Sequence, residues 1–271
     1  VLAHSRFDWL GTGAKVEINL DNLTAWVGDF YWPFLRISAL FMVVPFFGAR
    51  TIPVRIRVIL AVFVAFILQA TVTVEESIEL FSPLGVLTAL QQIAIGVVMG
   101  LIMQIVFAAL VMAGQTMATT MGLGFASSVD PQNGVQVTML GQLYLILGTL
   151  YFLAMDGHLL LLEVLANSFV YLPVGTPLNN AQIFGDIAMF AAQLFLAAVL
   201  ISLPVMVGVL LVNLAFGVIT RAAPQLNIFA VGFPTTMLAG FVLMFFSIPV
   251  LVPLLQNLFA TGFDFMQTLV N

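Results

Sequence analysis

Long apolar runs follow one another along the chain, and only short polar connections separate them. These runs cover residues 30–47, 58–74, 84–113, 135–172, 187–219 and 228–259. An α-helix needs about 20 apolar residues to cross a bilayer core of about 30 Å. The pattern therefore predicts an all-α membrane protein with about six long helical segments.

The last two runs are too long and too rich in proline for simple membrane-spanning helices. Residues 187–219 would form a helix of about 50 Å, at a rise of about 1.5 Å per residue, with Pro204 near its middle. The last run contains Pro234, Pro249 and Pro253. Interrupted helices in a membrane need protein or water to cover the freed backbone groups. We therefore expect partly proline-broken helices that are buried largely against protein.

The composition excludes several classes of protein. The chain is 62% hydrophobic and only 7% charged, whereas a typical soluble domain is about 25% charged. The 7 Lys and Arg residues leave no basic footprint for nucleic acid. With no Cys, the chain has no disulfide, thiolate zinc site or cysteine nucleophile. We expect no cofactor, and membrane lipid as the surrounding medium.

Residues 1–15 differ from the rest of the chain because they are mixed and polar, with no apolar core. A secretory signal needs such an apolar core. We interpret these residues as a non-native or upstream extension and give His4 and Arg6 no functional weight.

The few charged residues predict an orientation. Arginines cluster between the first two runs, another follows the fifth run, and the connection after the second run is acidic. Cytoplasmic loops carry the excess of Lys and Arg. If residues 135–172 make one crossing, both arginine sites lie in the cytoplasm and both termini lie outside.

A polar stretch near the middle of the chain, GFASSVDPQNG at residues 124–134, interrupts the apolar pattern. Asp130-Pro131 and Asn133-Gly134 are turn signals. Soft or bulky apolar side chains lie within and just before it, at Met117, Met121, Leu123 and Phe125. These features fit a mobile loop that seals a narrow opening, but an ordinary turn between helices explains them as well.

Four blocks of sequence resemble the FliR family, the export-gate proteins of bacterial flagellar type III secretion. The blocks are residues 35–61, 113–142, 152–175 and 217–234, and their joint order is more specific than any one motif. The resemblance implies a FliP-like part over residues 16–186, followed by a FliQ-like helical hairpin over residues 187–271.

The resemblance also implies partners and a location. Several copies of FliP and FliQ would join a single copy of this chain, and FlhB would wrap the cytoplasmic entrance. Unfolded flagellar proteins would be the exported substrates. The assembly would sit in the bacterial inner membrane at the flagellar basal body, raised partly toward the periplasm.

The plug loop of the family matches residues 114–134, and it would close the central pore until a substrate arrives. A methionine ring from the FliP-like subunits would help to seal the pore. The residues that the resemblance assigns to this gating loop are Met117, Met121, Leu123, Phe125, Asp130, Pro131, Asn133 and Gly134.

Arg36 lies inside the first apolar run. A charge at membrane depth is usually paired or faces a water-filled cavity. The residue either lines the export path, binds a carboxylate of a neighbouring subunit, or extends its charge to the membrane interface.

Asp156, His158 and Glu163 are the nearest approach to a catalytic or proton-relay set. Residues two or five positions apart do not face one another on a helix, so the spacing is poor for catalysis or metal binding. The sequence MDGH at residues 155–158 indicates a break within the helical run. We therefore expect no enzyme, and proton coupling by His158 is a minor hypothesis.

Three further residues have structural interpretations. Gly96 and Gly100 lie four residues apart, which permits close contact between helices. Arg221 follows the fifth run, where it would interact with carbonyls at a helix carboxyl end or with another subunit.

Two alternative functions remain open. Virulence injectisomes contain a homologous gate protein, and broken helices are also typical of secondary transporters. A transporter would bind a small solute as a single chain. No GxxxxGK[ST] nucleotide motif is present.

Overall fold

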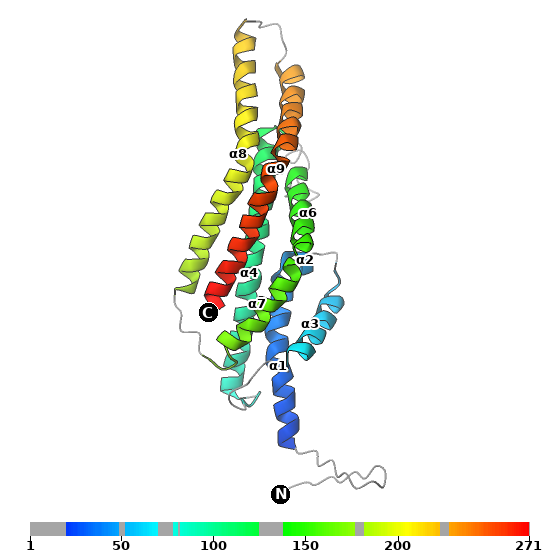
Figure 1. Cartoon of the computed structure of the whole chain (residues 1–271), viewed down its shortest axis with the longest axis vertical. Helices are drawn as coiled ribbons and strands as arrows, with labels where there is room; N and C mark the ends of the chain where they lie inside the picture. Colours follow the sequence, from blue (N-terminus) through cyan, green and yellow to red (C-terminus); the bar gives the residue numbers. More distant parts are fainter. Residues whose placement is uncertain are drawn as a thin grey trace.

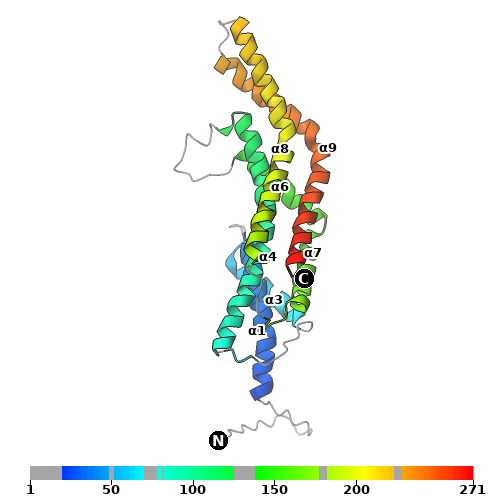
Figure 2. The same cartoon turned by 90° about the vertical axis from the view of Figure 1, so that its left-hand side faces the viewer.

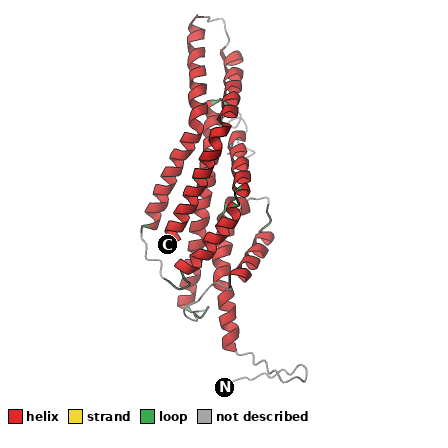
Figure 3. Ribbon diagram, in the orientation of Figure 1, coloured by secondary structure: helices red, strands yellow, loops and turns green. Residues whose placement is uncertain are grey.

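The computed structural model of the chain describes residues 20–48, 52–69, 78–80, 82–124, 138–176, 182–222 and 228–270. These residues form helices joined by short connections (Figure 1, Figure 3), which confirms the predicted all-α class. Residues 1–15 lie outside the described residues. The helices are α1 (Leu20–Val43), α2 (Pro45–Gly48), α3 (Val54–Leu68), α4 (Pro83–Thr120), α6 (Met139–Ala154), α7 (Gly157–Tyr171), α8 (Ile183–Ala222) and α9 (Ile228–Val270).

Each predicted apolar run corresponds to one helix or to two consecutive helices, but not every described helix is long and apolar enough to span a bilayer. Among the described residues, α4, α8 and α9 are long and apolar enough to span a membrane, and α6 with α7 makes a fourth span if the bent pair counts as one. Helix α3 has 15 residues, so at about 1.5 Å per residue it is shorter than a bilayer core of about 30 Å. Of the six predicted segments, the described residues therefore supply three or four candidate spans.

Local sequence explains where α4 and α6 begin. The Ser82 hydroxyl accepts a hydrogen bond from the Gly85 amide at 3.0 Å, and Pro83 takes the first helical position. The Thr138 hydroxyl accepts from the Gly141 amide at 3.1 Å in the same way at α6. Both residues satisfy an amide that has no partner within the helix.

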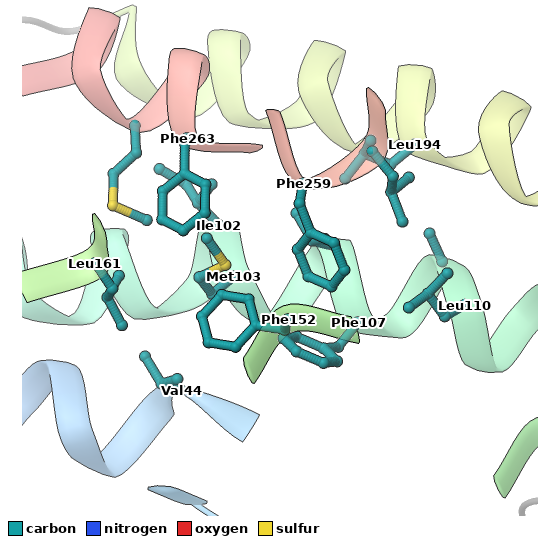
Figure 4. Close-up of a cluster of buried hydrophobic side chains, with 14 of the residues drawn as sticks. Val44, Ile102, Met103, Phe107, Leu110, Phe152, Leu161, Leu194, Phe259 and Phe263 are labelled. Atoms are coloured by element: carbon teal, nitrogen blue, oxygen red, sulfur yellow. The ribbon is translucent and has the colours of Figure 1, made fainter. Parts of the chain in front are cut away.

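Helix α4 is the centre of the fold, and α1, α6, α8 and α9 pack against it (Figure 1, Figure 2). A cluster of phenylalanines joins α2, α4, α6 and α9, and Figure 4 shows its members Phe107, Phe152 and Phe259. Phe152 of α6 lies at its middle, 5.0 Å from Phe46, 5.8 Å from Phe107 and 5.4 Å from Phe259, between ring centroids. Such tilted and edge-to-face contacts stabilise a core beyond the area they bury.

Helices α8 and α9 pack side by side, and one end of this pair extends beyond the other helices (Figure 1). The helix assignments run through Pro204 in α8 and through Pro234, Pro249 and Pro253 in α9. Figure 2 shows α9 changing direction along its length, so its prolines bend the helix without ending it. Helix α8 begins four residues before position 187, while the division into FliP-like and FliQ-like parts stays a prediction.

Candidate functional site

The first residues of the predicted plug loop are helical. Gly114 to Thr120 form the last two turns of α4, so the prediction of a flexible segment is wrong for this part. The hydroxyls of Thr116 and Thr120 donate to carbonyls of the preceding turn, at 2.8 Å to Met112 and 2.8 Å to Met117. Gly114 lets the helix approach α6 closely, because a Cβ there would lie 2.5 Å from the Leu140 carbonyl oxygen.

The two methionines of the segment are buried in the core of the chain. Met117 and Met121 have no exposed surface. Gly240 of α9 makes room for Met121, since a Cβ at Gly240 would lie 2.5 Å from the Met121 Cγ. Leu123 is half-buried against the core, so these three side chains hold the end of α4 against the rest of the chain.

Gly122 ends α4 in a backbone conformation that favours glycine, with a φ angle of 82°. The ring of Phe233 in α9 closes on this residue, because an added Cβ would lie 2.8 Å from the Phe233 Cε2. The other predicted gating residues lie outside the described residues: Phe125, Asp130, Pro131, Asn133 and Gly134.

Arg36 is fully buried inside the chain, where its donors meet polar groups of two other helices. Its Nε donates to Gln92 Oε1 at 2.8 Å. Its Nη1 donates to the Ser168 carbonyl at 2.8 Å and to the Ser168 hydroxyl at 2.9 Å, and its Nη2 donates to the Leu172 carbonyl at 2.9 Å. The guanidinium carbon lies 4.0 Å from the centre of the Phe169 ring.

This environment differs from the roles expected for Arg36. A side chain with 0% exposure in the single chain neither reaches the membrane interface nor faces a water-filled path. Its four hydrogen bonds go to uncharged oxygens of the same chain. The Ser168 and Leu172 carbonyls are at the carboxyl end of α7, where the helix dipole favours a positive charge. Arg36 is thus a cation held by a helix end.

The MDGH sequence forms the predicted break. Helices α6 and α7 meet there at an angle of 69°, and Asp156 has a left-handed backbone with φ 57°. Asp156 and Glu163 are exposed, while His158 is partly buried with its Nδ1 unpaired among the described residues. In that part of the chain no three His, Asp or Glu side chains form a group that could hold a metal.

Gly96 and Gly100 both face α1. A Cβ at Gly96 would overlap the Arg36 carbonyl oxygen, and a Cβ at Gly100 would lie 2.7 Å from the Val43 Cβ. This is the close approach that their four-residue spacing suggests. Arg221 is exposed in the last turn of α8, one residue before the helix ends.

Gln92 and Ser168 were not predicted as site residues. Gln92 follows another glutamine within the largely apolar run 84–113, and this polar pair is the available signal. Ser168 carries no such signal, because its partner Arg36 is 132 residues away in sequence.

Comparison with known proteins identifies the family. The family model for bacterial export proteins, family 1, matches residues 27–262. The chain is 35% identical over 256 residues to the flagellar biosynthetic protein FliR of Pectobacterium carotovorum, covering 94% of this chain and 98% of that protein.

Two further relatives are flagellar biosynthetic proteins FliR of other bacteria. The FliR protein of Escherichia coli K12 is 32% identical over 94% of this chain and 98% of its own length. The FliR protein of Bacillus subtilis 168 is 33% identical over 88% of this chain and 92% of its own length. A helical membrane protein with these matches over nearly all its length belongs to family 1 of the bacterial export proteins, the family of the flagellar biosynthetic protein FliR.

Proposed function

We propose that this chain is a subunit of the flagellar type III protein export gate. With FliP-like and FliQ-like subunits, it would form the pore through which unfolded flagellar proteins leave the cytoplasm. The family match and the names of the relatives support the flagellar export role. The surface of α8 supports the assembly with other subunits.

The apolar surface of α8 is longer than a bilayer can cover. Large apolar side chains are exposed from Phe184, at 81%, to Val218, at 64%. At about 1.5 Å per residue, these positions are about 51 Å apart along the helix. A bilayer core is about 30 Å thick, and even a tilt of about 40° leaves a span of about 39 Å. Part of the apolar surface of α8 therefore extends beyond a bilayer core, which supports the proposal that other protein subunits cover it.

The proposed roles of individual parts follow the resemblance. Residues 16–186 would stand among the FliP-like subunits, residues 187–271 would pair with FliQ-like hairpins, and FlhB would bind on the cytoplasmic side. The gating part of residues 114–134 would begin after α4, since Met117 and Met121 are core residues. The location would be the inner membrane at the flagellar basal body.

Native mass spectrometry of the tagged full chain, co-expressed with the FliP and FliQ proteins of the same genome, tests this function. We expect one copy of this chain with several copies of each partner. Replacing Leu210 and Leu214, which are 67% and 66% exposed, with asparagine should remove partners while the chain keeps its own thermal stability. A stable lone monomer or homodimer from the unaltered chain would contradict the proposal.

The transporter alternative makes a different prediction. A cavity between α6, α8 and α9, lined by Tyr144, Pro204 and Ser247 among others, has a volume of about 10 Å³. That volume holds about one water molecule and is too small for a solute. Saturable binding of a small solute to the purified single chain would favour the transporter.

The injectisome alternative is tested in cells. Restored swimming of a flagellar fliR deletion strain that expresses this chain would favour the flagellar role over the injectisome.

A further inference from the structure

Helix α7 is attached very differently at its two ends. At its amino end, the chain turns by 69° from α6. Asp156 there has a left-handed backbone and makes no side-chain capping hydrogen bond. At its carboxyl end, Arg36 from α1 bonds the last turn. The amino end of α7 is therefore a bend without a side-chain cap, whereas its carboxyl end is bound by hydrogen bonds from Arg36.

A single side chain provides the polar part of this fastening, beside the buried apolar residues of α7. Three of the four hydrogen bonds of Arg36 go to α7 and its end, at the Ser168 carbonyl, the Ser168 hydroxyl and the Leu172 carbonyl. The fourth goes to Gln92 of α4. Phe169, also on α7, stacks on the guanidinium. Arg36 thus joins the last turn of α7 to both α1 and α4.

The chemistry of this junction requires arginine. The guanidinium presents its donors in a flat, fixed fork and stacks on aromatic rings, whereas a lysine ammonium is a compact point charge. A lysine at position 36 keeps the charge but cannot reproduce bonds in two directions to Gln92 and Leu172 together with the contact to Phe169. A buried charge that loses its partners is strongly unfavourable.

We propose that Arg36 is a latch that docks α7 on the core. When the latch is broken, α7 moves away about the bend at Asp156 and Gly157, while α4 keeps its contacts with α1 and α8. This conformational device belongs to the fold of the chain itself and does not depend on the proposed function.

The absence of cysteine from the whole chain makes a clean test possible. A single reporter is introduced as Val164→Cys in α7, and a matched control as Val106→Cys in α4. These valines are 2% and 0% exposed, so both cysteines start protected. The rate of maleimide labelling of the full chain in membranes is measured for each reporter, with Arg36 or with Arg36→Lys.

We expect Arg36→Lys to raise the labelling rate about tenfold at Val164→Cys and less than about twofold at Val106→Cys, because local opening exposes one unit and leaves the rest protected. Ser168→Ala, which removes one of the four acceptors, should give a smaller rise at Val164→Cys. Unchanged labelling of Val164→Cys in both variants would overturn the latch. An equal rise at both reporters would also overturn it, because Arg36 would then stabilise the whole core.

Discussion

Helix α4 and the α8–α9 pair are similar in length and apolar character but differ in how the chain itself covers them. Within the most apolar stretch of each helix, the share buried inside the chain is 56% in α4, 28% in α8 and 17% in α9. Helix α4 is the core of one chain. The α8–α9 pair presents a surface whose covering must come from lipid or from other proteins.

The glycines of the two regions show the same contrast. Along α4, a Cβ at Gly96, Gly100 or Gly114 would meet a neighbouring helix at less than van der Waals distance. At Gly185 and Gly217 of α8, no atom lies within 4 Å of such a Cβ. Glycines therefore allow close packing along α4, whereas α8 has both kinds: Gly185 and Gly217 stand free, and Gly208 packs against Leu243 of α9.

Truncating a phenylalanine should have the largest effect and should separate the two regions. Phe152→Ala removes the centre of the buried ring cluster, so we expect a loss of about 3 kcal/mol in the free energy of unfolding. Phe246, 71% exposed on α9, should tolerate the same change within about 0.5 kcal/mol. Thermal unfolding of the purified chain in detergent measures both variants. Equal losses would show that α9 is also covered within the single chain.

Glycine-to-alanine changes should shift stability in opposite directions. Gly96→Ala places a methyl against the Arg36 backbone, which cannot move independently, and we expect a loss of about 2 kcal/mol. Gly217→Ala adds a methyl in open space within a helix, so a gain of about 0.5–1 kcal/mol follows from helix propensity alone. The difference in unfolding midpoint between the two variants is the measurement, and midpoints that shift in the same direction would contradict the packing described for α4.

Gly240→Ala tests the contact between α9 and the end of α4. Its new methyl meets the flexible Met121 side chain and not the backbone, so Met121 can shift. We expect a loss of about 1 kcal/mol. Adding Met121→Leu should change this loss, because the two sites are coupled. Strictly additive midpoint shifts in the double variant would mean that the two side chains do not contact.

The smallest effect should come from the bend. Asp156 adopts φ 57°, which glycine adopts more easily. Asp156→Gly should therefore be neutral or stabilising by about 0.5 kcal/mol, while Asp156→Val should be destabilising, because a branched side chain is strained there. The unfolding midpoint of each variant is the measurement. A lower midpoint for Asp156→Gly would mean that the exposed Asp156 carboxylate itself stabilises the bend.

The helices themselves follow from the apolar pattern, since every predicted run is helical over most of its described length. The end of α4 was not predictable in this way. The run was expected to end at residue 113, but α4 continues to Thr120. Threonine hydroxyls bond back to the previous turn, and Gly114 packs on α6. Glycine and threonine are typical of loops, and only the tertiary contact turns them into helix.

The candidate site was predictable only in part. The break between α6 and α7 can be predicted because its cause is local: the MDGH sequence at residues 155–158 is itself a turn signal. The partners of Arg36 are 56, 132 and 136 residues away in sequence. The pattern of a single chain does not contain such contacts, so Arg36 was expected to face outward. The burial of Met121 likewise depends on Gly240, which lies on another helix, so the local sequence around Met117 and Met121 predicts only a loop.

The contacts of α7 with Arg36 and with α9 bear on the order in which the protein is synthesised. As the ribosome makes residues 139–171, the Arg36 that fastens the carboxyl end of α7 already exists. Helix α9, which α7 also contacts, does not exist until the 40 residues of α8 have been synthesised. The contacts between α7 and α9 can therefore form only after the last helix has been made, whereas the hydrogen bonds between Arg36 and the end of α7 need only residues made earlier.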